Sequence, residues 1–343
     1  MRRRVVLGAA VSIGAGGPLG LFAQGRPEKS RITLVAPGWN QLAQVPLVVA
    51  VQQGFFKAEG LHVVLQEAPD TALSPPSAPS EDHLVMVSAP FEQVLQWRSQ
   101  GVAATAFAQV ARTPQVVVGV AVRAMSGFQH WRDLAGRTVG VMGWQSPSHH
   151  VLRWSLAHAG VSADEVQVLD VGTAVGASSA FKAGRVVAIA ATDPVATGLE
   201  QEGGMKVLVD TRVPAQSEQL YGGPVPGHCL VTLGEVLQHY PHTCQAMAHG
   251  LAHALQWLRT AGPGDLIKAL PDAYLHGDRA LYLAAFNKTR HSLSTDGLVP
   301  AEAPGNAHRV WARLGGVALV APGDLAATYT NAFARLAKAR FRV

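Results

Sequence analysis

Hydroxyl, carboxyl and imidazole side chains recur at one kind of place in this chain, directly after an apolar run and directly before a segment with helical periodicity. These side chains are Ser88, Ser146, Ser148, His149, Thr192 and Asp193. Ser and Asp in that place can cap the free backbone N–H groups of a helix, and an imidazole can donate or accept a hydrogen bond. Capping alone would explain any one of them. Their recurrence in successive segments favours a ligand-binding cleft instead.

Backbone and aromatic groups in equivalent places complete the candidate site. They are Gly38, Trp39, Asn40, Ala89, Pro90 and Trp144. An aromatic ring offers a stacking face to a ligand. Trp144 and His149 have an equally simple alternative, as a ring packed on the protein and a solvated residue in a first helical turn.

The chemistry of these groups leaves two classes of ligand open. Helix N-termini and serines suit a small oxyanion such as a sulfonate, nitrate or carboxylate, but Asp193 would repel one unless it caps its helix away from the ligand. If Asp193 faces the cleft, it would hold an amine or a nitrogen heterocycle, with Trp39 or Trp144 stacked on it. We favour an organic ligand over an inorganic anion.

Motifs for catalysis and metal binding are scarce. The sequence has no G-x-S-x-G, P-loop, G-x-G-x-x-G or H-E-x-x-H pattern. His249 and His253 could share a helix face, but a pair without a third ligand in register is a weak signal, and we interpret both as ordinary surface residues. The adjacent His149 and His150 would point about 100° apart on a helix. We assign no catalytic residue, no metal and no cofactor.

The elements that would position the candidate site begin with a strand, helix, strand unit. Residues 31–37 are typical of a strand, and residues 41–53 of a helix that ends at Gly54. Residues 61–65 form a second strand, and Val64 on its other face predicts a sheet covered on both sides. Such a unit implies a parallel pair of strands with a right-handed crossover.

The same pattern repeats along the chain. Strands are predicted over 84–87 and 138–142, and two further strand and helix units end at Gly203. This alternation predicts an α/β fold of doubly wound sheets. Two apolar runs, 115–122 and 228–233, interrupt it and are interpreted as crossings between two lobes.

The crossings divide the chain into two predicted lobes. Lobe 1 is discontinuous and comprises residues 30–116 and 231–343, and lobe 2 comprises residues 117–230. At 343 residues, the chain is more than twice the commonest domain size, which fits two lobes. Residues 234–257 are predicted to form an amphipathic helix, and the final segment a helix that packs back on lobe 1.

Phe55 and Phe56 stand between the glycines at 54 and 60. Two adjacent aromatic rings could form a ligand site. We interpret them as a structural corner at the edge of the core of lobe 1.

The N-terminal segment predicts export. Three arginines precede an uncharged stretch that ends near Ala23, as in a signal peptide over residues 1–23 for the Sec or twin-arginine route. An uncleaved anchor and a cytoplasmic N-terminus are the alternatives. Without this segment the formal charge falls from +5 to +2, because three of the 28 Lys and Arg residues lie in it. Nucleic-acid binding thereby loses its main support.

Cys229 and Cys244 are the only cysteines. In an oxidising compartment they could pair, or both could be unpaired buried thiols. Their spacing does not decide between these alternatives.

Several segments, in order, resemble a known family. AVQQGFFKAEGLHVVL, WRDLAGRTVGV, SPSHHVLRWSLAHAGV and STDGLVP are similar to segments of periplasmic solute-binding proteins of the nitrate/sulfonate/taurine class, which thiamine-pyrimidine synthases also resemble. The resemblance spans residue 32 to the C-terminal helix. Its motifs are individually modest, but their order is specific.

The resemblance implies a type II periplasmic binding protein fold, in which two lobes joined by two hinge strands close over a small ligand. It also implies a monomeric receptor in the periplasm whose partner is the membrane permease of an ABC importer. The cleft loops of the family correspond to residues 38–40, 88–90, 144–149 and 192–193. Where many members have Trp-Glu-Pro, this chain has Thr192, Asp193 and Pro194, which removes a stacking surface and shortens the acid.

Three functions are therefore in competition. The first is a receptor that captures a small organic solute, namely a sulfonate or taurine-like compound, a carboxylate or a nitrogen heterocycle, and delivers it to an importer. The second is an enzyme on the same fold, related to thiamine-pyrimidine synthesis, although that group carries a cysteine-rich motif that this chain lacks. The third is a ligand-sensing module of a signalling system. The export signal favours the receptor.

Overall fold

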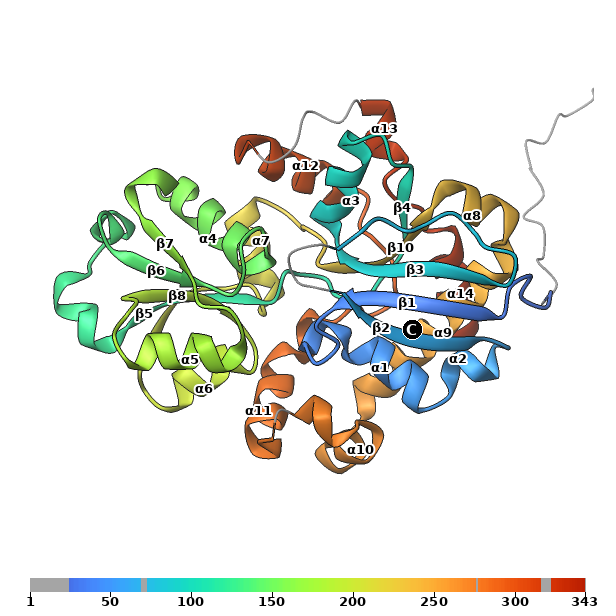
Figure 1. Ribbon diagram of the computed structural model, residues 1–343, viewed down its shortest axis with the longest axis horizontal. Helices are drawn as coiled ribbons and strands as arrows, with labels where there is room; N and C mark the ends of the chain where they lie inside the picture. The colour runs from blue at the N-terminus through green and yellow to red at the C-terminus, as the bar shows by residue number, and fades with distance from the viewer. Residues whose placement is uncertain (1–24, 69–72, 276, 316–321, 343) are drawn as a thin grey trace, which may run out of the picture.

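Two lobes, each built on a five-stranded sheet, make up the protein (Figure 1). The computed structural model describes residues 25–68, 73–275, 277–315 and 322–342. The predicted signal peptide, residues 1–23, lies outside the described residues. None of the described helices is both long and apolar enough to cross a membrane.

The sheet of lobe 1 has the strand order β2-β1-β3-β10-β4. Its strands are β1 (Arg31–Pro37), β2 (His62–Ala68), β3 (His83–Pro90), β4 (Ala104–Gln109) and β10 (His228–Leu233). Strand β1 is parallel to β2 and β3, as the strand, helix, strand pattern predicts. Strand β10 is antiparallel to both of its neighbours, because it enters the sheet from lobe 2.

The sheet of lobe 2 has the same arrangement, in the order β7-β6-β8-β5-β9. Its strands are β5 (Val116–Ala121), β6 (Thr138–Val141), β7 (Gln167–Asp170), β8 (Ala188–Thr192) and β9 (Met205–Asp210). Strands β6, β7 and β8 are parallel, whereas β5 is antiparallel to β8 and β9. All six residues of β5 are buried, which explains why this run of the sequence is continuously apolar.

Helices cover both faces of each sheet. Those of lobe 1 are α1 (Val45–Gln52), α2 (Phe55–Ala58), α3 (Phe91–Ser99), α8 (Gly234–His239), α9 (Pro241–Thr260), α10 (Pro263–Ala269), α11 (Arg279–Thr289), α12 (Ala303–Arg313), α13 (Pro322–Ala326) and α14 (Ala332–Phe341). Those of lobe 2 are α4 (Pro147–His158), α5 (Ala174–Lys182), α6 (Val195–Gln201) and α7 (Pro214–Tyr221). Short 3-10 helices span Leu42–Gln44, Val122–Gly127, Trp131–Leu134, Ala163–Glu165, Asp272–Leu275 and Arg290–Ser292.

Strand β3 shows how one sheet separates two layers of core. Leu84 and Met86 pack in the hydrophobic cluster that contains α1 and α9. Val87 and Ala89 pack in a second cluster with α3. Successive side chains of a strand point to opposite faces, so a strand buried on both sides carries apolar residues throughout.

Strand β2 departs from the prediction of a sheet covered on both sides. It lies at the edge of its sheet, and Val64 is 51% exposed. The apolar residue at this position therefore faces solvent. Sequence alternation alone does not distinguish an edge strand from a central one.

The two crossings between the lobes run side by side. The backbone N–H of Gly227 donates to the carbonyl of Ala111 at 3.0 Å, and the N–H of Val110 donates to the carbonyl of His228 at 2.8 Å. A Cβ atom on Gly227 would lie 2.1 Å from the carbonyl oxygen of Thr113, so the crossing requires a glycine there. Strand β10 begins at His228, which places residues 228–230, assigned to lobe 2 from the sequence, in the sheet of lobe 1.

The corner at Phe55 and Phe56 is structural, as predicted. Gly54 has a φ of +73° and separates α1 from α2, and Phe56 is 1% exposed in the core. Phe56 packs against Gly250 of α9, where a Cβ atom would lie 2.3 Å from its ring. Phe55 stacks on His253 with ring centroids 3.8 Å apart.

The predicted helix over residues 234–257 is two helices, because α9 begins at Pro241. The interpretation of His249 as a surface residue is wrong, since it is 8% exposed and lies against α14. Its Nδ1 atom lies 3.0 Å from Oε2 of Glu59, which also accepts a hydrogen bond from Arg340 at 2.9 Å. These contacts fasten the closing helix α14 to lobe 1.

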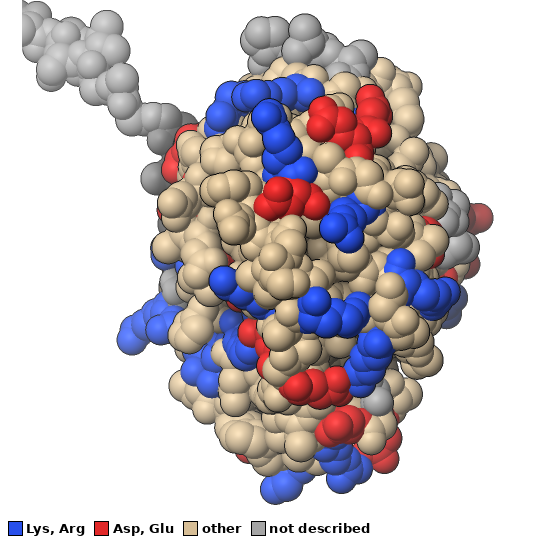
Figure 2. Space-filling view, turned by 90° about the vertical axis from the view of Figure 1, so that its left-hand side faces the viewer, with Lys and Arg blue, Asp and Glu red and all other residues tan. Residues whose placement is uncertain are grey.

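Charges of both signs are interspersed on the face at the lobe 2 end of the molecule (Figure 2). The described residues of that face therefore form no continuous basic surface of the kind that binds nucleic acid.

Candidate functional site

A cavity of about 400 Å³ lies between the two lobes. Residues that line it follow the carboxyl ends of strands in both sheets, namely Gly38 after β1, Pro90 at the end of β3, Met142 after β6, Gly172 after β7 and Thr192 at the end of β8. Ligands of open parallel sheets bind at these ends of the strands. The cavity is thus in the place that the fold favours for a ligand.

Part of the predicted site lines this cavity. The residues that do so are Gly38, Asn40, Pro90, Ser146, Ser148, Thr192 and Asp193. The predicted residues that lie outside the lining are Trp39, Ser88, Ala89, Trp144 and His149.

Trp39 and Ser88 are turned into the core of lobe 1. The indole N–H of Trp39 donates to the carbonyl of Gln66 at 2.9 Å, and the ring is 5% exposed. The hydroxyl of Ser88 is fully buried and donates to Oε1 of Gln44 at 2.7 Å. Ala89 packs in the cluster with α3. The structure gives these three residues a role in positioning the loops.

The loop before α4 uses its serine hydroxyls internally. Ser146 is the N-cap of α4, and its Oγ donates to the carbonyl of Gly143 at 2.7 Å. The Oγ atoms of Ser146 and Ser148 are 2.7 Å apart, so the proton of Ser148 points to Ser146. The Oγ of Ser148 also accepts from the N–H of Met142 at 2.9 Å. Both hydroxyl protons are therefore committed, and the loop is held rigid beside the cavity.

His149 and Trp144 form a separate pair on this loop. Nδ1 of His149 accepts from the N–H of Gln145 at 3.1 Å. Burial, together with the neighbouring His150 and Arg153, lowers the pKa of His149 to about 4, so its imidazole is neutral at pH 7. Trp144 meets this ring edge-on at 5.1 Å and is 49% exposed.

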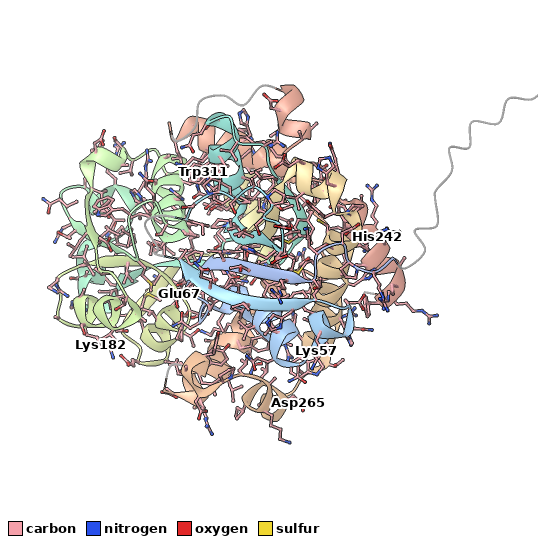
Figure 3. All side chains as sticks on the ribbon, turned by 45° about the vertical axis from the view of Figure 1, so that its right-hand side comes forward. Lys57, Glu67, Lys182, His242, Asp265 and Trp311 are labelled. Carbon is pink, nitrogen blue, oxygen red and sulfur yellow. The ribbon has the colours of Figure 1, made fainter. Side chains whose placement is uncertain are left out.

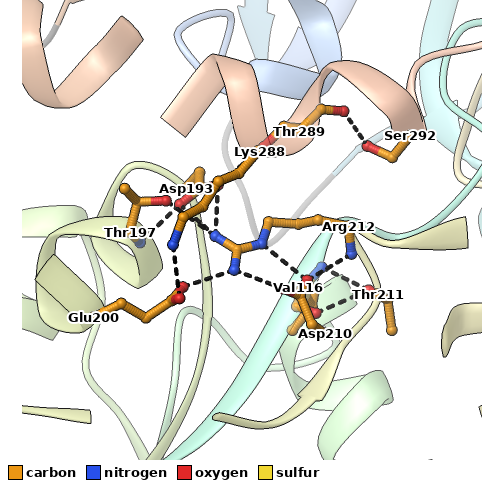
Figure 4. Close-up of polar contacts among 10 residues, drawn as sticks. All are labelled: Val116, Asp193, Thr197, Glu200, Asp210, Thr211, Arg212, Lys288, Thr289 and Ser292. Carbon is orange, nitrogen blue, oxygen red and sulfur yellow. Dashed lines mark hydrogen bonds and ion pairs between the residues drawn. The ribbon is translucent and has the colours of Figure 1, made fainter. Parts of the chain in front are cut away.

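Asp193 is a buried carboxylate with its oxygens already engaged (Figure 4). Oδ1 accepts from the N–H of Thr197 at 2.9 Å, which caps the first turn of α6. Oδ2 accepts from Nη1 of Arg212 at 3.1 Å and from Oγ1 of Thr289 at 2.9 Å. The sequence left open whether this carboxylate caps its helix or faces a ligand. In the structure it caps α6, and Arg212 balances its charge.

Arg212 is the centre of this cluster and is 1% exposed. It pairs with Asp193, with Glu200 at 2.7 Å and with Asp210 at 2.7 Å. Burial by itself lowers the pKa of Arg212, but the hydrogen bond to Asp210 and the charges of Asp193 and Asp210 outweigh it and raise this pKa above its ordinary value. Arg212 therefore stays charged and is fully occupied by these partners.

Helix α11 of lobe 1 reaches this cluster across the cavity. Thr289 donates to Asp193, and Nζ of Lys288 pairs with Oε2 of Glu200 at 2.7 Å (Figure 4). We call these two bonds the α11–α6 contact. They tie the two lobes together at one edge of the cavity.

Two lining residues that the sequence analysis missed lie at the crossings. Gln115 begins the run that becomes β5, and His228 is the first residue of β10. They are 5% and 3% exposed, and Nε2 of Gln115 and Nδ1 of His228 are buried without a hydrogen-bond partner among the described residues. Gln115 also has a φ of +60°, a strained conformation for this residue type. The sequence could have indicated both residues, since each predicted crossing begins with a polar residue.

Other missed lining residues follow the strand pattern or come from distant loops. They are Pro37, Gln41, Leu42, Ala43, Glu67, Leu73, Gln93, Pro114, Met142, Gly172, Thr173, Ala174, Val175, Pro194, Val195 and Thr289. Gln145 and Pro147, which belong to the predicted cleft loop 144–149, also line the cavity. The loop at Thr173 follows β7 as the predicted loops follow their strands, so the repeat could have identified it. Glu67 lies at the end of β2 that faces lobe 2 (Figure 3).

The thiols and histidines form no metal or disulfide site among the residues that the structure describes. Cys229 and Cys244 are both free and buried, and they belong to different hydrophobic clusters. Burial raises the pKa of each thiol. Neither thiol is therefore poised as a nucleophile.

Comparison with known proteins identifies the family. The sequence model of the family described as NMT1/THI5 like matches residues 41–257. This chain belongs to the NMT1/THI5-like family. None of the curated proteins compared with the chain matches it.

Solved structures share the fold across nearly the whole chain. A protein of Bordetella bronchiseptica RB50 is 30% identical with a TM-score of 0.79, and the match covers 93% of this chain and 100% of that one. The periplasmic aliphatic sulphonate binding protein SsuA of Escherichia coli is 18% identical with a TM-score of 0.65, with coverage of 88% and 97%. The desulfurization enzyme DSZB is 15% identical with a TM-score of 0.58, with coverage of 90% and 99%.

These comparisons confirm the two-lobed fold and the predicted class of the chain. Because the same fold occurs in a binding protein and in an enzyme, fold alone does not assign the activity. The function has to be argued from the cavity.

Proposed function

We propose that the protein is an extracytoplasmic substrate-binding receptor that captures a small organic solute in the interlobe cavity and delivers it to the membrane permease of an ABC importer. The observation that carries this proposal is the cavity itself, which both lobes line with loops that follow strand ends. A ligand held from both sides links its binding to the arrangement of the lobes. A permease could then recognise the liganded shape.

The state of the two thiols, and that of Asp193 in the cavity lining, supports binding over catalysis. Both thiols are buried with raised pKa values. Asp193 is held in an ion pair and in the cap of α6, so it is not placed as a general base. These features favour the receptor over an enzyme on the same fold.

The receptor hypothesis is accompanied by four further proposals from the sequence. The protein is exported with a signal peptide over residues 1–23, acts in the periplasm, works as a monomer and takes an organic ligand. Sulfonates and taurine-like compounds, carboxylates and nitrogen heterocycles are the classes to be tested.

A thermal-shift screen of the purified protein tests the proposal. Sulfonates, taurine, nitrate, aromatic acids, carboxamides, pyrimidines and flavins would be added singly, because a ligand that binds only the folded state raises the melting temperature. We expect at least one organic class to raise it and to reduce the radius of gyration measured by small-angle X-ray scattering. If none of these compounds shifts the melting of protein shown to carry no ligand from its source, the receptor proposal fails.

A further inference from the structure

The cavity is lined by amides and lacks cations among the residues that the structure describes. Five lining residues carry a side-chain amide, namely Asn40, Gln41, Gln93, Gln115 and Gln145. The charged side chains in the described lining are the carboxylates of Glu67 and Asp193. Amides can both donate and accept hydrogen bonds, so this lining suits an uncharged polar ligand.

The floor of the cavity contains two polar groups that lack partners. Buried polar groups in folded proteins nearly always have a hydrogen-bond partner, so each exception calls for an explanation. Gln115 and His228 both line the cavity at the crossings, and both have a buried nitrogen without a described partner. A ligand in the same cavity is one explanation that accounts for both.

The electrostatics of the cavity disfavour an anion. Burial lowers the pKa of His228 to about 4, so its imidazole is neutral at pH 7 and supplies no positive charge. Arg212 lies behind Asp193 and is occupied by three carboxylates. Glu67 has no ion-pair partner among the described residues, and its carboxylate would repel an anion.

Helix N-termini do not reverse this balance. The first turn of α4 is capped by Ser146, whose Oγ accepts from the N–H of His149. The N-cap of α5, Thr173, makes no capping bond with its side chain, and Thr173 and Ala174 line the cavity. A helix terminus carries about half a charge, which suits the oxygen of a carbonyl group without needing a full negative charge.

Resting on the proposed receptor function, we propose that Gln115 and His228 form a recognition pair at the floor of the cavity for the carboxamide, lactam or urea group of an uncharged ligand. Nε2 of Gln115 is a donor and suits the carbonyl oxygen of such a group. His228, as a neutral imidazole, can donate or accept and suits either atom of it. The ligand class is thereby narrowed from organic solutes in general to solutes without a negative charge.

Matched pairs of compounds test this inference by isothermal titration calorimetry at pH 7.5. The pairs are nicotinamide with nicotinate and benzamide with benzoate, supplemented by 2-pyrrolidinone and methanesulfonate. We expect the amide member of each pair to bind at least ten-fold more tightly than its anion. If an anion binds as well as its amide or better, this inference is overturned while the receptor proposal stands. If no member binds, this inference also fails, and the broader thermal-shift screen then decides on the receptor.

Substitution variants test whether Gln115 contacts the ligand. Gln115→Met keeps the approximate size of the side chain and removes the amide, and we expect it to weaken binding of nicotinamide at least ten-fold. Thr232→Val is the matched control, because Thr232 is buried on β10 with an unpartnered hydroxyl and lies outside the cavity lining. It should bind nicotinamide as the unaltered protein does. Equal binding by the Met variant and the control would remove Gln115 from the site.

A measurement on the unaltered protein reports on His228 without depending on the affinity of a variant for the ligand. With ¹⁵N-labelled histidine, the Nδ1 resonance of His228 should shift on addition of nicotinamide and stay in place on addition of nicotinate. The His228→Gln variant assigns the resonance by its disappearance. An unchanged Nδ1 resonance at saturating nicotinamide would show that His228 does not contact the ligand.

Discussion

At the scale of single residues, the cavity depends on how buried charges are balanced. Arg212 is almost completely buried and meets three carboxylates. Removing one partner of a buried ion pair leaves the others uncompensated, which costs more than the pair contributes. Arg212 thus sets the charge that Asp193 presents at the cavity wall.

Replacing Arg212 with Met should therefore destabilise the protein strongly. We expect the free energy of unfolding to fall by about 3–5 kcal/mol, as for other buried pairs that lose one partner. Urea denaturation followed by circular dichroism measures it. Arg279→Met is the control, because the pair of Arg279 with Asp272 is exposed, and a loss of at most about 1 kcal/mol is expected. Similar losses in the two variants would contradict the central role of Arg212.

His228 should make the protein less stable as the pH falls. Its folded-state pKa is lowered to about 4 from an ordinary 6.5 by burial, against an opposing effect of Glu92. The unfolded chain binds the proton more readily between these values, so the contribution of His228 is full above pH 6.5 and is lost towards pH 4. The loss amounts to about 3 kcal/mol.

Urea unfolding at several pH values between 7.5 and 4.5 checks this window. The His228→Gln variant should lose less stability over the range than the unaltered protein does. His149 contributes in the same direction, because burial lowers its pKa to about 4 as well, so the variant should retain part of the slope. If the free energy of unfolding fell equally with pH in both proteins, His228 would not be the cause of the loss of stability.

At the scale of elements, the proposed closure of the lobes depends on which helices meet across the cavity. Helix α11 belongs to the core of lobe 1 through Tyr282 and Phe286. Its last two residues reach α6 of lobe 2 in the α11–α6 contact. The pair of Lys288 with Glu200 is partly exposed, so it can form and break at little cost, whereas the hydrogen bond from Thr289 to Asp193 is buried.

Replacing Lys288 with Met should therefore shift the ligand-free protein towards an open form. We expect an increased radius of gyration by small-angle X-ray scattering, with a change of at most about 1 kcal/mol in the free energy of unfolding, because the Lys288 side chain is 38% exposed. Lys182→Met is the control, since Lys182 pairs with Glu202 within lobe 2. If both variants scatter as the unaltered protein does, the α11–α6 contact does not hold the lobes together.

At the scale of the whole molecule, the lobes are joined differently at their two edges. On one side, a single hydrophobic cluster extends from α3 of lobe 1 through α12 to α4 of lobe 2. Trp311 of α12, labelled in Figure 3, meets His150 of α4 with ring centroids 4.1 Å apart. The other side has the polar α11–α6 contact. We infer that opening would occur mainly at the polar side.

The separation of the cysteines into different clusters predicts a protein without a disulfide. Both thiols should react with a thiol reagent after denaturation, and react only slowly in the native state because both are buried. A reductant should leave the melting temperature unchanged. A lower melting temperature in the reductant, or fewer than two reactive thiols in the unfolded chain, would contradict this arrangement.

The alternation of strands and helices could be predicted from the sequence because it depends on local patterns. Strand β1 occupies the predicted residues, and Gly54 ends the first helix as expected. The candidate loops could be located because they follow strand ends. The direction of each side chain could not, since Trp39 and Ser88 turn into the core through contacts with Gln66 and Gln44.

The sequence by itself determined the two-lobed α/β class and the loops that follow strand ends, because hydrophobic periodicity and helix stops act over a few residues. The order of its motifs indicated the family by resemblance. Only the tertiary structure decided which side chains line the cavity. It brought together Gln115 and His228, more than a hundred positions apart in the chain, and it placed Arg212 against Asp193. Such long-range contacts depend on how the crossings and sheets pack, and local sequence patterns carry no information about that packing.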